Sequence, residues 1–120
     1  MSKNFAVVIE DDMDLSEIFS EALRASDYEV EAIRDGRTAQ ERLKEIIPTI
    51  IMLDLHLPYV DGSTLLKQIK EDSRLDKTRV ILATADGVQA ERYRKLANLV
   101  LVKPITYTQL RDLSKRLRVE

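Results

Sequence analysis

Apolar and polar positions divide the chain into two kinds of segment that alternate along its length. Short runs that are apolar at nearly every position, such as residues 5–9, are typical of strands covered on both faces by helices. The segments between these runs carry apolar residues at the spacing of an α-helix. Strands are expected at residues 5–9, 28–33, 49–54, 79–84 and 98–102, with a helix after each. This pattern predicts an α/β domain of the (βα)5 type with a parallel sheet.

The second predicted strand differs from the others. Its charged residues, Glu29 and Glu31, alternate with apolar ones, so one of its faces should contact water, as at the edge of a sheet. With right-handed crossovers, a second strand at the edge favours a doubly wound five-stranded sheet of order 2-1-3-4-5. In such a sheet the strand order reverses between the first and third strands, and ligands bind at that point.

Turn and capping residues indicate where the helices begin and end. The first helix carries an apolar stripe from Leu15, and Asp14 with Glu17 resembles a capping pair at its start. The second helix should carry apolar residues as far as Ile47, because Pro48 then stops it.

Asp61 should cap the third helix, and Thr106 with Gln109 should form a capping box for the last. The fourth helical segment, residues 86–97, has the least defined bounds, because its apolar anchors are few: Val88, Tyr93, Leu96 and Ala97.

Composition narrows the class of protein. We expect a single domain over residues 1–120 with no output region attached, large enough for a core without disulfides. Apolar residues make up 44%, charged residues 33%, and the net charge of -2 gives no sign of direct nucleic-acid binding. The absence of cysteine excludes thiolate nucleophiles and sulfur-ligated zinc. No apolar run approaches the roughly 18 residues of a membrane span, and residues 1–4 lack a signal-peptide core, so we expect a cytoplasmic protein without membrane insertion.

Polar residues stand at the carboxyl ends of four predicted strands. They are Glu10, Asp11 and Asp12 after the first, Asp54 at the end of the third, Thr84 at the end of the fourth and Lys103 after the fifth. Because the carboxyl ends of parallel strands line one crevice, these side chains should meet.

Such a set has the chemistry needed for magnesium-dependent phosphoryl transfer to a carboxylate. An anionic phosphoryl group repels an attacking Asp54, so a divalent cation must bridge the two. Asp11 and Asp54 are candidates for direct magnesium ligands, and Glu10 for a ligand through water. Lys103 and the Thr84 hydroxyl can supply a positive charge and a hydrogen-bond donor to the phosphoryl oxygens.

Each of these residues also has an ordinary structural explanation. Consecutive acids are common at a helix N-terminus, and an aspartate that ends a strand is usually a cap. Thr84 alone is an ordinary strand residue. The functional interpretation depends on all four groups falling at one edge of the same predicted sheet.

Short motifs with a familiar order occur along nearly the whole chain. They are Val8-Ile9-Glu10-Asp11-Asp12, Met52-Leu53-Asp54-Leu55-His56-Leu57-Pro58 with Asp61-Gly62, Ala83-Thr84-Ala85, and Lys103-Pro104. As a set they resemble the receiver domain of two-component response regulators, a family with a flavodoxin-like fold.

The resemblance implies a phosphoacceptor signalling domain that assists its own phosphorylation and dephosphorylation but is not otherwise an enzyme. Asp54 would accept a phosphoryl group from the phosphohistidine of a sensor histidine kinase or phosphotransfer protein. The backbone carbonyl of His56 would join Glu10, Asp11 and Asp54 as a magnesium ligand, and the Lys103-Pro104 peptide bond would be cis.

Phosphorylation would change a surface around the fourth helix and fifth strand that a downstream effector protein reads. The apolar edge run of the fifth strand is also the expected place for a homodimer contact. Two departures from the family pattern lie on this side of the molecule. Val100 stands where an aromatic residue is usual, and the interval from Thr84 to Lys103 is shorter than usual.

Two alternatives remain open. A receiver-like interaction module would bind partners without phosphorylation, and phosphoryl uptake would distinguish it from a phosphoacceptor. A phosphohydrolase of the haloacid dehalogenase type also uses an aspartyl nucleophile. That family needs a second aspartate two residues after the first, where this chain has His56.

Overall fold

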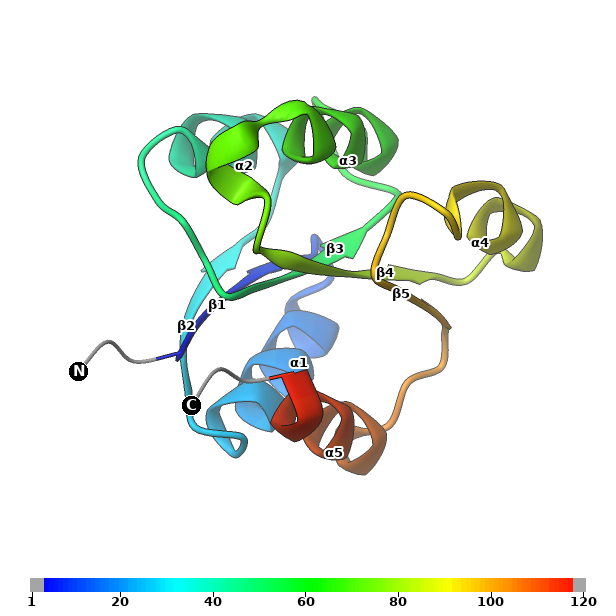
Figure 1. The fold of residues 1–120 in the computed structure, drawn as a ribbon. Coiled ribbons are helices and arrows are strands. Elements are labelled where there is room, and N and C mark those ends of the chain that lie inside the picture. The colour runs from blue at the N-terminus through cyan, green and yellow to red at the C-terminus, as the bar shows by residue number, and fades with distance from the viewer. Residues whose placement is uncertain (1–3, 118–120) are drawn as a thin grey trace.

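A five-stranded parallel sheet lies between two layers of helices in the computed structural model, which describes residues 4–117 (Figure 1). The strands are β1 (Asn4–Ile9), β2 (Tyr28–Ile33), β3 (Ile50–Asp54), β4 (Arg79–Thr84) and β5 (Leu99–Val102). The helices are α1 (Met13–Arg24), α2 (Gly36–Leu43), α3 (Gly62–Glu71), α4 (Gly87–Tyr93) and α5 (Tyr107–Leu117), with a short 3-10 turn, η1 (Ser73–Leu75). The predicted fold class is confirmed, while the two ends of the predicted domain, residues 1–3 and 118–120, lie outside the described residues.

The sheet has the order β2-β1-β3-β4-β5, as predicted, with β2 at one edge. Helices α1 and α5 cover one face, and α2, α3 and α4 cover the other (Figure 1). Residues 6–9 of β1 and all of β3 are buried because helices cover both faces of these central strands, which explains why the two strands are apolar at nearly every position.

Two apolar clusters join the sheet to its helices. Successive residues of β1 point to opposite faces, so Val7 packs with the α2 and α3 side whereas Val8 packs with the α1 and α5 side. Each buried aliphatic side chain stabilises the fold by about 1.5–3 kcal/mol relative to an exposed one, so a slip that drew polar Glu10 into this apolar run is disfavoured. The resulting register pairs Ile9 with Leu53, and the residues that follow this pair, Glu10 and Asp54, therefore reach the same rim of the sheet.

The first helix begins earlier than predicted. Asp12 is its N-cap, in an extended conformation, and its side chain accepts a hydrogen bond from the Leu15 backbone N–H at 2.9 Å. Asp14 lies inside the first turn, so the predicted capping pair of Asp14 and Glu17 is wrong. Asp12 takes the role because its backbone is extended and directly precedes Met13, the first helical residue.

The second helix is shorter than predicted. It begins after its N-cap Asp35 but ends at Leu43, and Ile47 is 61% exposed instead of packing on a helix face. The chain must turn here to enter the sheet, where the Thr49 backbone N–H bonds the Phe5 carbonyl at 2.8 Å. Pro48 also disfavours helical geometry in Ile47, the residue before it, so the helix could not continue up to the proline.

The fourth helix is short as well. Asp86 caps it, and Ala90 is its buried residue, whereas the predicted anchor Val88 is 73% exposed. Beyond this helix the Asn98 side-chain oxygen accepts a hydrogen bond from the Val80 backbone N–H at 2.8 Å, which aligns the start of β5 with β4. The expected caps of α3 and α5 are confirmed: Asp61 accepts from the Ser63 N–H and Thr106 from the Gln109 N–H.

Across residues 4–117, none of the helices combines the length and the apolar composition that crossing a membrane would require.

Candidate functional site

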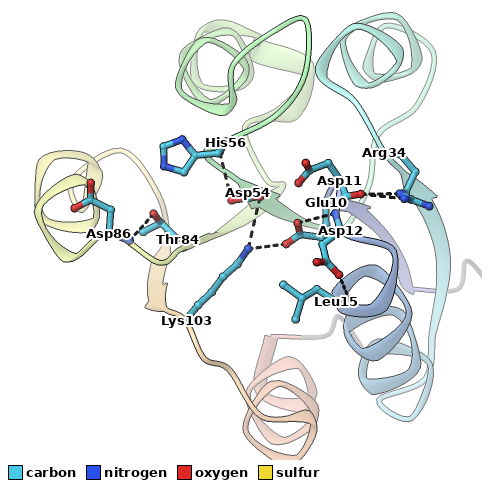
Figure 2. A network of polar contacts seen from close by, with 10 residues as sticks. All are labelled: Glu10, Asp11, Asp12, Leu15, Arg34, Asp54, His56, Thr84, Asp86 and Lys103. Atoms are coloured by element: carbon cyan, nitrogen blue, oxygen red, sulfur yellow. Dashed lines mark hydrogen bonds and ion pairs between the residues drawn. The ribbon is translucent and has the colours of Figure 1, made fainter.

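The carboxyl ends of the strands bring four of the predicted side chains into one pocket (Figure 2). The Lys103 ammonium lies 2.8 Å from a Glu10 oxygen and 3.6 Å from an Asp54 oxygen. One carboxylate oxygen from each of Glu10, Asp11 and Asp54 lies within 4.8 Å of the other two. The predicted convergence of β1, β3 and the segment after β5 is therefore present in the structure.

The turn after β1 places two acids with different surroundings. Glu10 is only 2% exposed, its backbone N–H bonds the Ile33 carbonyl at 3.0 Å, and its side chain accepts a hydrogen bond from the Asp12 N–H at 3.2 Å. Asp11 is exposed, and its carboxylate is directed toward the same space as Asp54 (Figure 2). Asp12 is occupied as the cap of α1, so the turn contributes Glu10 and Asp11 to the pocket.

Asp54 is buried at the end of β3 and is held from two sides. One carboxylate oxygen accepts a hydrogen bond from the His56 backbone N–H at 3.3 Å, and the other faces Lys103. The backbone of α3 packs directly behind it, because a Cβ atom on Gly62 would lie 2.1 Å from the Asp54 carbonyl oxygen. The absence of a side chain at Gly62 therefore allows α3 to approach the end of β3.

Thr84 is fully buried at the end of β4, but its hydroxyl does not bond a carboxylate of the pocket among the residues that the structure describes. The hydroxyl oxygen instead accepts a hydrogen bond from the Asp86 backbone N–H at 3.1 Å (Figure 2). The Thr84 carbonyl accepts one from the Lys103 backbone N–H at 2.7 Å. Thr84 therefore connects the backbone that carries Lys103 with the residue that caps α4.

The Lys103-Pro104 peptide bond is cis, as the resemblance implied. The His56 side chain is exposed, and its ring points away from the acidic cluster (Figure 2). The role of the His56 carbonyl as a metal ligand stays a prediction.

The charges in the pocket do not balance. Burial raises the pKa of the Glu10 carboxyl to about 7, and the nearby Asp54 adds to this, against the hydrogen bond from Lys103. Burial by itself would lower the pKa of the Lys103 ammonium, but its hydrogen bond to Glu10 and the charge of Asp54 raise that pKa above its ordinary value. One ammonium thus faces two buried carboxylates, and the excess negative charge favours a proton on Glu10 or a bound cation.

The donor set fits a hard divalent cation. Magnesium prefers oxygen ligands and is usually held by one or two carboxylates together with water or substrate oxygens. Glu10, Asp11 and Asp54 provide carboxylate oxygens close together, beside a pocket with excess negative charge. These residues could hold magnesium without rearrangement of the strands.

One further residue at this rim, Arg34, was not predicted from the sequence. It follows the last residue of β2, and its guanidinium donates two hydrogen bonds to the Asp11 carbonyl, at 3.2 Å from Nε and 2.9 Å from Nη2 (Figure 2). The acceptor is a backbone oxygen, which no side-chain motif encodes. Only the strand pairing, which sets the end of β2 beside the turn after β1, could have indicated the contact.

Comparisons with known proteins give a consistent result. A family model described as the response regulator receiver domain matches residues 6–115. The phosphate regulon transcriptional regulatory protein PhoB of Rhizobium meliloti is 34% identical over 106 residues, which cover 86% of this chain and 47% of PhoB. The polar-differentiation response regulator DivK of Brucella ovis is 30% identical over 94 residues, which cover 78% of this chain and 76% of DivK.

Solved structures show the same fold. The chemotaxis response regulator CheY4 of Vibrio cholerae superposes with a TM-score of 0.87 at 22% identity, covering 98% of this chain and all of that one (100%). The signal receiver domain of a signal transduction histidine kinase from Syntrophus aciditrophicus has a TM-score of 0.84 at 28% identity, covering 95% of this chain and 89% of that one. The chain spans only part of the length of its curated relatives: 47% of PhoB and 34% of the transcriptional regulator RpaA of Synechocystis.

Proposed function

Because the chain belongs to the family of response regulator receiver domains, we propose that it acts in a phosphorelay as a magnesium-dependent phosphoacceptor, with Asp54 as the acceptor. The observation that carries this proposal is the arrangement of the pocket. A buried Asp54 shares an oxygen cluster with Glu10 and Asp11, and the Lys103 ammonium lies within 3.6 Å of its carboxylate.

The proposed reaction is an in-line transfer to an oxygen of Asp54. That oxygen forms a bond to phosphorus while the bond from phosphorus to the histidine nitrogen of the donor breaks. Bound magnesium, held by Glu10, Asp11, Asp54 and the predicted His56 carbonyl, would offset the repulsion between the carboxylate and the phosphoryl oxygens.

Lys103 and Thr84 would stabilise the charge on the transferred group. The Lys103 ammonium already lies beside the acceptor oxygen, so it can donate to a phosphoryl oxygen with little movement. The Thr84 hydroxyl would donate to a second phosphoryl oxygen. Its oxygen now accepts the Asp86 N–H, so a shift of Thr84 toward the phosphoryl group would disturb the residue that caps α4.

The proposed output therefore runs from Thr84 through Asp86 to α4 and the neighbouring β5. A downstream effector protein would read this surface, and the donor would be a sensor histidine kinase or phosphotransfer protein in the cytoplasm. The homodimer through α4 and β5 stays a prediction from the sequence. On the α5 side of β5, the two elements border a cavity of about 300 Å³, which is lined by Leu99, Leu101, Gln109, Asp112, Leu113 and Arg116.

A second candidate function is an interaction module that works without phosphorylation. It is favoured by Val100, which is buried in β5 where an aromatic residue would be expected from the family pattern. The complete oxygen cluster favours the phosphoacceptor instead. A haloacid dehalogenase type of phosphohydrolase is disfavoured, because His56 stands where its second aspartate is needed.

Phosphoryl uptake tests the proposal directly. The full chain is incubated with magnesium and acetyl phosphate, and its mass is measured by intact-protein mass spectrometry. Wild type should gain one phosphoryl group, whereas Asp54→Asn, or wild type with the magnesium chelated, should gain none. Asp35→Asn is a matched control, because Asp35 caps α2 outside the pocket and its loss should leave uptake intact. Equal uptake by Asp54→Asn and wild type would contradict the proposal.

A further inference from the structure

The carboxylates of the oxygen cluster are held in place by different means. Glu10 and Asp54 are buried and contact Lys103, and each also accepts a backbone hydrogen bond. The Asp11 side chain is exposed and has no hydrogen bond or ion pair among residues 4–117. Its direction therefore depends on the orientation of its own backbone.

Arg34 is the residue that holds this backbone. We propose that Arg34 is a positioning residue that fixes the Asp11 peptide, so that the Asp11 carboxylate is directed toward the cation before the cation binds. The proposal rests on the phosphoacceptor function proposed above and assigns a role to a residue outside the predicted site.

The geometry of the contact supports this role. Both Nε and Nη2 of Arg34 donate to one oxygen, the Asp11 carbonyl, so the planar guanidinium limits rotation of that peptide group. The contact follows from the sheet, because Ile9 pairs with Ile33 and the Glu10 N–H extends the ladder to the Ile33 carbonyl. The end of β2 is thereby fixed beside the turn that carries Asp11.

The use of an arginine here is unusual. A guanidinium forms its strongest paired hydrogen bonds with carboxylates, yet Arg34 makes no ion pair within residues 4–117 and instead binds a backbone oxygen. Its positive charge near the cluster would repel a cation. The residue therefore has two opposing effects on metal affinity: it orients Asp11, and it adds an unfavourable charge.

Measuring magnesium affinity at low and high salt concentration distinguishes these two effects. Repulsion between exposed charges is screened over a Debye length of about 8 Å at physiological ionic strength and over less at higher salt. The orientation of the Asp11 peptide is a matter of local geometry and is far less sensitive to salt. We expect orientation to be the larger effect, since loss of a group that orients a metal ligand typically lowers metal affinity about tenfold or more.

The turn has other supports, so variants at this position should fold. Asp12 still caps α1, and its N–H still bonds the Glu10 side chain. Loss of the Arg34 contact should therefore loosen the Asp11 peptide without unfolding the domain.

The first test measures magnesium binding to the full chain by calorimetry, without a phosphoryl donor. At high salt, Arg34→Met should bind magnesium about tenfold more weakly than wild type. At low salt the difference should shrink, because the variant has also lost a repelling charge. Arg34→Lys, which keeps the charge but not the paired donors, should be weaker than wild type at both salt concentrations. Arg37→Met is the matched control: Arg37 stacks 4.7 Å from the Tyr59 ring centroid, and its loss should not change the affinity at high salt.

The second test needs no metal. Amide hydrogen exchange at Asp12, whose N–H belongs to the peptide group that Arg34 binds, should be faster in Arg34→Met than in wild type, while amides of the central strands keep their protection. Unchanged exchange, or high-salt magnesium affinity in Arg34→Met equal to that of wild type, would overturn the positioning role. Failure of wild type to bind magnesium at all would instead contradict the proposed function, and the exchange measurement would still decide the role of Arg34.

Discussion

Two regions of this domain, the acceptor rim and the output side, differ in how closely their residues are packed. We use acceptor rim for the residues of the proposed phosphoacceptor site, Glu10, Asp11, Asp54, Thr84 and Lys103, and output side for α4 and β5, where we propose that a partner binds. Glu10, Asp54 and Thr84 are 2%, 5% and 0% exposed. On the output side α4 has one buried residue, Ala90, and β5 has one, Val100.

The glycines of the two regions show the same contrast. A Cβ atom on Gly62, behind Asp54, would lie 2.1 Å from a backbone oxygen, whereas one on Gly87, at the start of α4, would meet nothing within 4 Å. The phosphoryl transfer proposed for the acceptor rim would need charged groups placed within a fraction of an ångström, and close packing of the backbone around them would serve that need. A surface that serves only to bind a partner, as proposed for α4 and β5, would have no such requirement and could vary, which fits the short α4 and the valine at position 100.

The largest effect is expected from Gly62→Ala. The added methyl group cannot be accommodated beside the backbone of Asp54 and Leu55, so α3 or the end of β3 must move, and stability should fall by about 3 kcal/mol or more. Urea denaturation measures the loss. In the folded fraction, phosphoryl uptake by Asp54 should also be slowed, because the acceptor is displaced.

If Gly62→Ala kept both wild-type stability and wild-type uptake, close packing behind the acceptor would not be needed, and the contrast between the two regions would lose its basis.

The second prediction concerns the excess negative charge of the acceptor rim. The folded pKa of Glu10 is raised from its ordinary 4.5 to about 7, so the folded state binds an extra proton between these values. Without metal, the contribution of Glu10 to the free energy of unfolding should therefore be largest below pH 4.5 and should decrease as the pH rises to about 7. The loss is on the order of 3 kcal/mol. Denaturation at a series of pH values, with a chelator present, should show this slope in wild type and a flatter one in Glu10→Gln.

Added magnesium should reduce the loss in wild type near pH 7, because a bound cation replaces the proton. Identical pH slopes in wild type and Glu10→Gln would show that burial of Glu10 does not unbalance the pocket.

The fold and most of the pocket could be predicted because strongly patterned features encode them. The central strands are apolar at nearly every position since helices cover both faces, and the ends of parallel strands necessarily share one rim. Glu10, Asp54 and Lys103 could therefore be brought together from sequence alone, and Figure 2 shows them in contact.

The predictions that failed concern the exact ends of helices, where neighbouring residues suit the same role. The contact that was missed is made to a backbone carbonyl. Asp12 and Asp14 both suit a helix cap, and the sequence does not show after which of them the helix begins. Apolar Ile47 suits a helix face, but α2 ends at Leu43, before it reaches Ile47, because the chain must turn to enter β3. Arg34 binds a carbonyl, so no pattern of side chains could reveal its partner.

On the output side, Val100→Ala should lower the stability of the domain without changing the rate of phosphoryl uptake. Val100 is 9% exposed and belongs to the cluster between the sheet and α2, α3 and α4, so removing two methyl groups should cost about 1–2 kcal/mol. The rate of phosphoryl uptake from acetyl phosphate should stay at the wild-type level, because no group of the acceptor rim is touched. A clear change in uptake rate would mean that β5 and the acceptor are coupled more tightly than the comparison implies.

The smallest effect is expected from Gly87→Ala, the counterpart of the change at Gly62. Gly87 is the first residue of α4, no atom lies within 4 Å of the added methyl group, and its φ is not positive. Alanine should therefore stabilise the domain by about 0.5–1 kcal/mol, mainly because the unfolded chain becomes less flexible. The same urea denaturation measures it, with uptake by Asp54 unchanged. The same chemical change would then destabilise one region and stabilise the other, and a loss of stability at Gly87 would show that the start of α4 is as constrained as the backbone behind Asp54.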